Sequence, residues 1–188
     1  MPRQQSKMDR FLARTEPPPN TSTSDGVLDL YVKCALTEYE SIDQNKVFIR
    51  TKRVLNKDEI PECKCNRGED WTEVCGIGCE NRSMQVECVR GKCVTEGPCS
   101  NQQMQNGSIA LLSVKKLHDK GISLFASQPI LPGAFVCQYT GEIIESSTYS
   151  RRDKEFKGST NYYGMSLTKG EVIDARACGG IARLANHS

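Results

Sequence analysis

Short apolar and alternating runs follow one another through the C-terminal half of the chain. Each run is rich in aliphatic or aromatic side chains, and turn residues separate the runs. This pattern predicts several short strands in small sheets. The runs are 108–114, 122–126, 134–139, 162–167 and 171–174. The turn signals between them are Lys120-Gly121, Leu131-Pro132-Gly133 and Lys169-Gly170.

One stretch nearer the N-terminus has the period of an amphipathic helix. After Asp25, a candidate N-cap, apolar side chains recur at helical spacing, which predicts one helix. The apolar positions are Val27, Leu30, Tyr31, Cys34 and Ala35. Because Cys34 lies on this predicted face, we interpret it as a small buried hydrophobe and not as a metal ligand.

The remaining segments complete the predicted organisation. A polar run at 146–157 predicts one short helix among the strands. Residues 1–24 combine basic side chains with a proline run and a Thr/Ser stretch, a composition that predicts a disordered tail. We expect a helix at 25–43, an irregular zinc module at 44–104 and a strand-rich domain at 105–188. The expected fold class is mostly β, with an irregular metal-rich segment and few short helices.

Composition and charge exclude several classes of protein. The formal net charge of +2 over 188 residues is too small to argue for a nucleic-acid partner. No apolar run approaches the roughly 18 residues of a membrane span, and the first residues lack the apolar core of a secretory signal. We therefore expect no membrane segment and a reducing compartment, where clustered cysteines are typical of metal sites.

A cysteine block is the strongest chemical signal. Seven of the ten cysteines have the spacing C-x-C-x9-C-x3-C-x8-C-x4-C-x5-C, and no histidine lies among them. Disulfide pairing would leave one thiol over. Two tetrahedral zinc ions need eight ligand positions, which seven sulfurs fill if one bridges both ions. Such closed sites leave no position for water, so we predict a structural role. The seven are Cys63, Cys65, Cys75, Cys79, Cys88, Cys93 and Cys99.

The block, with its string CGIGCENRSMQVECVRGKCVTEGPCSNQQMQ, resembles the AWS (associated with SET) zinc module. The resemblance implies two zinc ions that share one cysteine. By position, the first ion would be held by Cys63, Cys65, Cys75 and Cys79. The second would be held by Cys75, the shared ligand, with Cys88, Cys93 and Cys99.

Three strings after the block resemble the SET domain, the lysine-methylating fold. They are K-G-I-S-L from Lys120, Y-T-G-E-I-I from Tyr139, and a longer stretch from Tyr162 that ends in A-R-L-A-N-H-S at Ser188. The last is the most specific, because both order and spacing agree with the family. Over about residues 44–188, the chain is similar to the histone-lysine methyltransferases that modify lysine 36 of histone H3.

The resemblance implies an enzyme, its cofactor and its partner. A methyl group would pass from S-adenosylmethionine to a deprotonated lysine in a narrow channel, and orientation would supply much of the rate. The expected partner is histone H3 in the nucleosome, and the expected location is chromatin in the nucleus. The positions that match cofactor contacts are Lys120, Gly121, Ile122, Tyr162, Tyr163, Arg183, Asn186 and His187.

These residues also have ordinary structural interpretations. Tyr162 and Tyr163 can be strand aromatics, and His187 can be a partly buried histidine; the surrounding strings favour a site. Glu142 can be a solvated strand residue, and we interpret His118 as a surface residue.

Four positions depart from the family's strings. Ser123 replaces the second glycine of the turn, and Gly180 replaces an asparagine. Gly164 stands where the family has an aromatic or large apolar residue, and Leu184 replaces a phenylalanine. The loss of two buried aromatics predicts a packing cost of several kcal/mol unless neighbours compensate.

The family's C-x-P-N string, its catalytic tyrosine and a further cysteine cluster would follow Ser188, so the catalytic residue is not assigned within this chain. We expect residues 1–188 alone to be inactive for that reason. The alternative function is a non-catalytic, zinc-containing chromatin interaction module. A third class, a secreted disulfide protein, would bind no metal.

A separate motif lies near the N-terminus. Gln5, Met8, Phe11 and Leu12 are similar to the box Q-x-x-aliphatic-x-x-aromatic-aromatic that binds the replication sliding clamp. One tight helical turn would bring Met8, Phe11 and Leu12 into a single apolar pocket. Leu12 departs from the aromatic of the pattern. The alternative is an amphipathic piece of a disordered tail.

Overall fold

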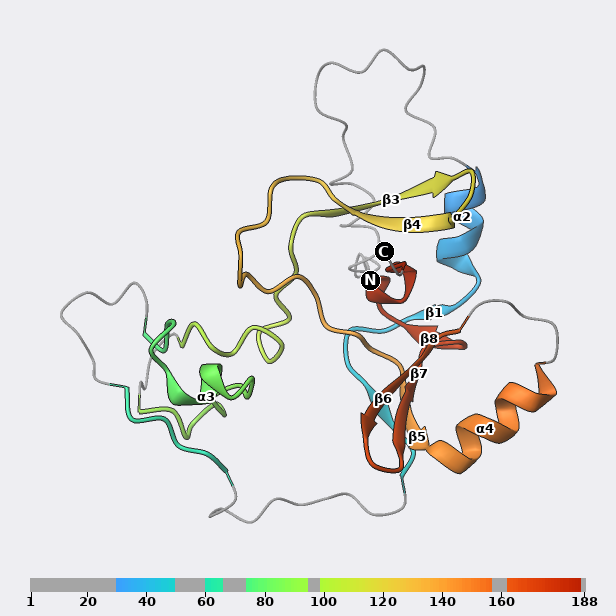
Figure 1. Cartoon of the computed structure of the whole chain (residues 1–188). Coiled ribbons are helices and arrows are strands. Elements are labelled where there is room, and N and C mark those ends of the chain that lie inside the picture. Colours follow the sequence, from blue (N-terminus) through green and yellow to red (C-terminus); the bar gives the residue numbers. More distant parts are fainter. Residues whose placement is uncertain (1–29, 50–59, 66–73, 95–98, 157–161, 187–188) are drawn as a thin grey trace, which may run out of the picture. The chain divides into compact units, whose positions relative to one another are not determined.

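The computed structural model describes residues 30–49, 60–65, 74–94, 99–156 and 162–186 (Figure 1). They form two compact units, each built from segments that are distant in sequence. The first unit combines the described residues up to Phe48 with 111–129 and with those from Tyr139 onward. The second combines 130–138 with the described residues between Ile49 and Ala110.

A helix and a hairpin form one part of the first unit. Helix α2 (Leu30–Thr37) packs beside the antiparallel strands β3 (Leu112–Leu117) and β4 (Gly121–Ala126) (Figure 1). The chain reverses just before β4, where Gly121 has a φ of 67°, a conformation that glycine adopts without strain. The core that joins these elements to the 3₁₀ helix η3 (Ile181–Leu184) contains Val32, Leu36, Val114 and Leu184.

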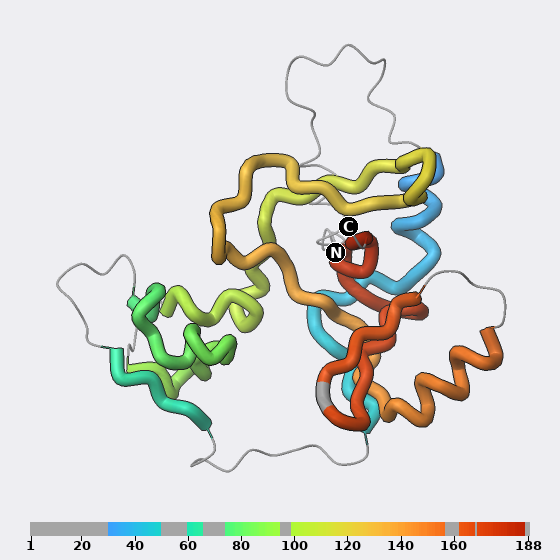
Figure 2. Tube along the Cα trace, viewed as in Figure 1, coloured from blue at the N-terminus to red at the C-terminus, as the bar shows by residue number. Residues whose placement is uncertain are grey.

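Two further sheets complete the first unit. The larger has the strand order β2 (Lys46–Val47), β5 (Glu142–Glu145), β7 (Glu171–Asp174) and β6 (Gly164–Thr168). Strands β2 and β5 are parallel, and the other neighbours are antiparallel. The smaller sheet pairs β1 (Glu40–Ser41) with β8 (Cys178–Gly179) in parallel. The early residues therefore run beside the C-terminal ones, as the tube in Figure 2 shows in blue and red.

Helix α4 (Ser146–Glu155) follows β5 and confirms the helix predicted from the polar run. None of its residues is buried, and ion pairs together with the Tyr149 ring, which lies beside Gly164, connect it to the sheet. Arg152 forms ion pairs with Glu142 and with Asp174, whose side chain is 1% exposed.

The second unit has a different kind of core. Among its described residues, helix α3 (Glu80–Ser83) is the single regular element. The buried cluster consists of cysteines and one aliphatic residue: Cys63, Val74, Cys75, Cys79, Cys88 and Cys99. This composition confirms the prediction of an irregular segment whose interior is made of sulfur.

The predicted fold class, mostly short strands with few helices, is confirmed, but three local predictions are wrong. The run 134–139 forms no strand, although Ala110 N donates a hydrogen bond to Val136 O at 2.7 Å. Helix α2 ends at Thr37, short of the predicted end at 43.

The predicted apolar face of this helix is also wrong. Cys34 is exposed, and Leu30 is 70% exposed, whereas Val32 and Leu36 are buried. The helix carries apolar residues on two faces, so periodicity alone could not select the one that packs. The N-terminal part of the predicted helix, 25–29, lies outside the described residues, as does the predicted tail.

Candidate metal centre and cofactor site

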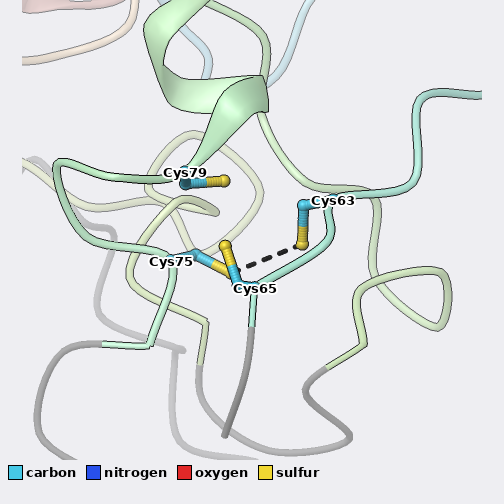
Figure 3. Close-up of side chains that lie close together, drawn as sticks. All are labelled: Cys63, Cys65, Cys75 and Cys79. Atoms are coloured by element: carbon cyan, nitrogen blue, oxygen red, sulfur yellow. Dashed lines mark hydrogen bonds between the residues drawn. The ribbon is translucent and has the colours of Figure 1, made fainter. Parts of the chain in front are cut away.

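The sulfurs of the cysteine block face one another in the second unit. Two quartets of cysteines could each hold a metal ion, and within each quartet all sulfurs lie within 4.8 Å of one another. The first quartet is Cys63, Cys65, Cys75 and Cys79 (Figure 3). The second is Cys63, Cys75, Cys88 and Cys93.

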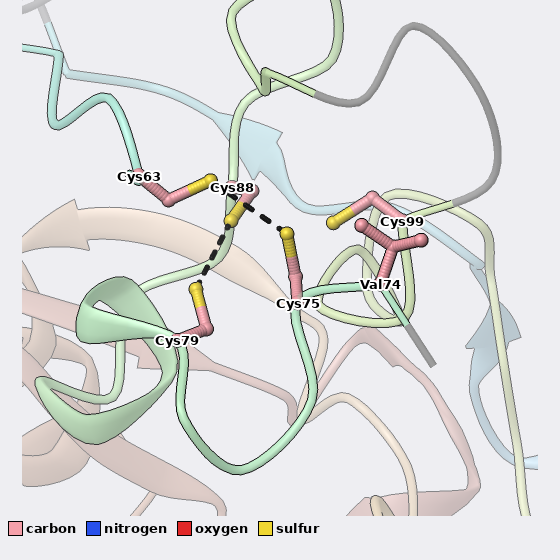
Figure 4. Close-up of a cluster of buried hydrophobic side chains, with 6 residues drawn as sticks. All are labelled: Cys63, Val74, Cys75, Cys79, Cys88 and Cys99. Atoms are coloured by element: carbon pink, nitrogen blue, oxygen red, sulfur yellow. Dashed lines mark hydrogen bonds between the residues drawn. The ribbon is translucent and has the colours of Figure 1, made fainter. Parts of the chain in front are cut away.

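The sulfur separations match those of a zinc site. Cys75 Sγ lies 3.6 Å from Cys63 Sγ and 3.5 Å from Cys93 Sγ, and Cys79 Sγ lies 3.8 Å from Cys88 Sγ (Figure 4). Four sulfurs at about 2.3 Å from a central zinc would be about 3.8 Å apart. A disulfide would need about 2.0 Å, and none of the ten cysteines, which all lie in the described residues, forms one. The donor set therefore fits zinc.

Cys75 lies at the centre of the cluster. Its sulfur contacts those of Cys93, Cys63, Cys99 and Cys65, and it belongs to both quartets. Burial, followed by these thiols, raises the pKa of Cys75 far above its ordinary value. A coordinating metal ion reverses such a shift, because a metal-bound thiol loses its proton. Cys75 also has a φ of 63°, a strained conformation that persists where surrounding contacts require it.

Two buried asparagines support Cys88, and the sequence analysis missed them. Asn81 Nδ2 and Asn101 Nδ2 each lie 3.5 Å from Cys88 Sγ and donate to it. Burial raises the pKa of Cys88 to about 12, and these two amides act in the opposite direction. Each asparagine follows a cysteine by two residues, at Cys79 and Cys99, so a C-x-N pattern was the available signal.

The second quartet differs from the one implied by the resemblance. It contains Cys63 where the resemblance places Cys99. Cys99 is nevertheless buried in the same cluster, and its thiol interacts with those of Cys75 and Cys93.

In the first unit, the structure joins two of the strings expected at a cofactor site. Asn186 Nδ2 donates to Lys120 O at 3.2 Å and to Ser123 Oγ at 2.6 Å. At Gly121, no atom of the described residues other than its two chain neighbours lies within 4 Å of the position where a Cβ would be. The backbone of this turn is therefore open to a ligand on that side, which fits the expectation of a bound cofactor.

Arg183 lies between two aromatic rings. Its guanidinium carbon is 4.0 Å from the centroid of Tyr39 and 3.9 Å from that of Tyr163. Its Nη2 donates to Arg176 O at 3.5 Å, and its Nε is buried without a partner among the described residues. Tyr163 O in turn accepts a hydrogen bond from Tyr139 Oη at 3.0 Å.

The other predicted cofactor residues have different positions. The Tyr162 side chain is 77% exposed, and Ile122 packs against the apolar core of the first unit. His187 lies outside the described residues. Tyr39 and Ser123 are contacts that the sequence interpretation did not assign, because they join segments far apart in the chain.

Comparison with known families agrees with this arrangement. Residues 70–106 match the AWS domain family, and residues 121–188 match the SET domain family. A solved chain from a study titled "Structural basis for the product specificity of histone lysine methyltransferases" is similar with a TM-score of 0.61 and 19% sequence identity. The similarity covers 89% of this chain and 77% of that one. It confirms the predicted SET-type fold.

Sequence relatives carry specific names. The histone-lysine N-methyltransferase ASHH2 of Arabidopsis thaliana is 35% identical over 152 residues, which are 80% of this chain. Histone-lysine N-methyltransferases named as H3 lysine-36 specific, from Cryptococcus neoformans and Aspergillus fumigatus, are 36% and 35% identical over 70% and 68% of this chain. The chain spans 9%, 16% and 14% of the lengths of these three relatives.

Proposed function

We propose, on the premise that the chain carries an AWS domain followed by SET-domain residues, that this protein is a histone-lysine N-methyltransferase. Its methyl donor would be S-adenosylmethionine and its target lysine 36 of histone H3. One structural observation carries the proposal: Asn186 is hydrogen bonded to the Lys120 turn and to Ser123. The names of the relatives support the choice of substrate.

The residues of this chain would act mainly by orientation. S-adenosylmethionine supplies a methyl group on a sulfonium, ready for attack by a neutral lysine amine. The open backbone at Gly121 would let the cofactor approach the main chain, and Asn186 would hold the turn in place. A fixed geometry of this kind lowers the entropic part of the barrier.

Labelled methyl transfer to nucleosomes tests the proposal. We expect the protein extended past Ser188 by the family's catalytic segment to label nucleosomes that contain unmodified histone H3 and not those in which lysine 36 of H3 is replaced by alanine. Residues 1–188 alone should give no label. Asn186→Ala should lower the rate at least about tenfold, because one hydrogen bond at an oriented site is worth about 1.5 kcal/mol. Asn106→Ala is the matched control, since this amide contacts Arg90 in the other unit.

The outcomes separate the competing functions. Equal labelling of both nucleosomes would overturn the choice of lysine. Cofactor and nucleosome binding without any labelling would favour the non-catalytic chromatin module.

We also propose that the cysteine block holds two zinc ions with Cys75 as the shared ligand. Cys75 and Cys63 both belong to the two quartets, and the support for Cys75 is that its sulfur also interacts with that of Cys99, the remaining cysteine of the block. Its sulfur lies 3.6 Å from that of Cys63 and 3.5 Å from that of Cys93. Among the described residues, Val74 is the one aliphatic member of the buried cluster in this unit. Zinc would then supply stability that an apolar core supplies elsewhere. We assign the seven cysteines a structural role, because full coordination by protein excludes water.

We propose chromatin in the nucleus as the location, because the substrate is a histone. No helix in the described part of the chain is long and apolar enough to cross a membrane.

A sliding clamp is proposed as a second partner, through Gln5, Met8, Phe11 and Leu12. These residues lie outside the described part, so the proposal depends on the motif alone. A peptide of residues 1–20 should bind the clamp in a titration, and the peptide with Phe11→Ala should not. Equal binding of both peptides would refute it.

A further inference from the structure

A segment ahead of the cysteine block is built into the first unit. Residues 30–48 precede both family matches, which begin at 70 and 121. Yet this segment contributes α2 to the apolar core and provides strands to two sheets. The candidate cofactor site therefore includes structure that neither family match covers.

The segment contacts two consecutive residues of η3. Tyr39 lies against Arg183, and α2 packs on Leu184 through Val32 and Leu36. A 3₁₀ helix of four residues has little stability of its own. Its position must therefore come from such side-chain contacts. The early segment provides these two, and β4 also packs against η3 in the same apolar core through Ile122 and Leu124.

Tyr39 is well placed to hold Arg183. Its side chain is 7% exposed, and its ring and that of Tyr163 lie at nearly equal distances from the guanidinium. None of the ion pairs within the described residues involves Arg183. The two aromatic faces and the Arg176 carbonyl are thus the groups in contact with its positive charge, and cation–π attraction strengthens when water is excluded.

The backbone around Tyr39 is itself fixed. Glu40 N donates to Ala177 O at 2.9 Å, and Ile42 N donates to Gly179 O at 3.0 Å. Asn45 Oδ1 accepts from Gly141 N at 2.9 Å. The residues that follow Tyr39 are therefore hydrogen bonded to the rest of the first unit, and this fixes the backbone that carries the Tyr39 ring.

We propose that Tyr39 is a positioning residue for cofactor binding. Its ring and that of Tyr163 hold Arg183 and so fix residues 181–186, which carry Asn186 to the Lys120 turn. The inference rests on the proposed function only in naming the ligand, S-adenosylmethionine. The contact of Tyr39 with Arg183 does not depend on the proposed function.

The experiment compares three variants of the protein. Tyr39→Phe keeps the ring, and Tyr39→Leu keeps an apolar side chain but removes the aromatic face. Tyr31→Leu is the matched control, because this tyrosine lies on the same segment, is 63% exposed and faces Lys116. Amide hydrogen exchange and the dissociation constant of S-adenosylmethionine are measured for each. The kcat and KM of each are measured in the protein extended past Ser188 by the family's catalytic segment.

We expect Tyr39→Leu to speed amide hydrogen exchange at 181–186 and to weaken the binding of S-adenosylmethionine about tenfold. The KM should rise accordingly, and kcat should not change. Tyr39→Phe and Tyr31→Leu should match the wild type. Exchange that rises equally throughout the first unit would overturn the positioning role, as would an unchanged affinity in Tyr39→Leu. If the wild type bound no S-adenosylmethionine, the proposed function would fail, and exchange at 181–186 would still decide whether Tyr39 holds Arg183.

Discussion

Neighbouring side chains compensate for three of the four positions at which this chain departs from the SET strings. Ser123 accepts a hydrogen bond from Asn186, and Leu184 is 6% exposed within the apolar core. The Tyr149 ring fills the space beside Gly164, so an aromatic from α4 replaces the missing side chain. The structure does not explain Gly180, whose φ of −93° suits any residue.

The shared sulfur makes a prediction about metal content. Cys75→Ser should lose both zinc ions, because Cys75 belongs to both quartets, whereas Cys65→Ser should lose one. Cys34→Ser is the control and should keep both, since Cys34 is exposed on α2. Native mass spectrometry measures the ion count per chain. Loss of the same number of ions from Cys75→Ser and Cys65→Ser would contradict the bridge.

The half-buried Tyr139 predicts a dependence of stability on pH. Burial raises the pKa of Tyr139 from 10.0 to about 12. Between these values the unfolded chain has lost the proton that the folded chain keeps, so this contribution to stability falls as the pH rises from about 10 to about 12. Tyr139→Phe has no proton to lose and should show a shallower fall of unfolding free energy in urea titrations. Parallel curves for the two proteins would count against this assignment.

The sequence could predict the members of the candidate site better than their contacts. The cysteines are identified by spacing within one short block, and Lys120 and Asn186 by strings. Tyr39 carries no such signal, because its partner Arg183 is distant in sequence and only the folded chain joins them. The same holds for Asn81 and Cys88, whose hydrogen bond depends on an irregular loop.

At the scale of elements, local signals predicted turns well and packing faces poorly. Gly121 has a positive φ at the first residue of β4, and Gly170 has a positive φ in the turn directly before β7. The turn signals in the sequence indicated both positions. Helix α4 was also predicted, because its polar run can be recognised in the local sequence without knowledge of tertiary contacts. The run 134–139 has the composition of a strand but gained no neighbouring strand in the structure, and composition does not report pairing.

The contact between α4 and β6 leads to a prediction about Gly164. A Cβ at this position would overlap the Tyr149 ring, so Gly164→Ala should destabilise the protein by about 1–3 kcal/mol. Gly78→Ala is the control, because no atom lies within 4 Å of its Cβ position. Thermal or urea unfolding measures both.

A double mutant tests the cause. Tyr149→Leu should recover part of the loss in the Gly164→Ala background, with a coupling energy of about 1 kcal/mol. Strictly additive effects would show that the overlap is not the reason for the loss.

At the scale of the whole molecule, the two units depend on different stabilising forces. The first has an apolar core and three sheets, and the buried cluster of the second is almost wholly sulfur. The chain also interleaves them, since residues 49–110 and 130–138 of the second lie between segments of the first. An interrupted domain of this kind is hard to predict from sequence, because the pairing of its segments is long-range and no local pattern reports it.

The interleaving predicts the effect of removing the early segment. A chain that begins at residue 49 keeps both family matches but loses α2, β1 and β2, and with them the residues that cover Leu184 and Arg183. The larger sheet would expose the edge of β5, β8 would lose its one partner strand, and the apolar core would lose Val32 and Leu36, each worth about 2 kcal/mol or more when buried. We therefore expect no cooperative unfolding of the first unit in this chain, measured by circular dichroism on heating. A chain that begins at residue 25 should unfold like the full one, because residues 1–24 have a composition that predicts no fold of their own. A transition in the shorter chain at the temperature of the full one would show that the SET residues fold without the segment.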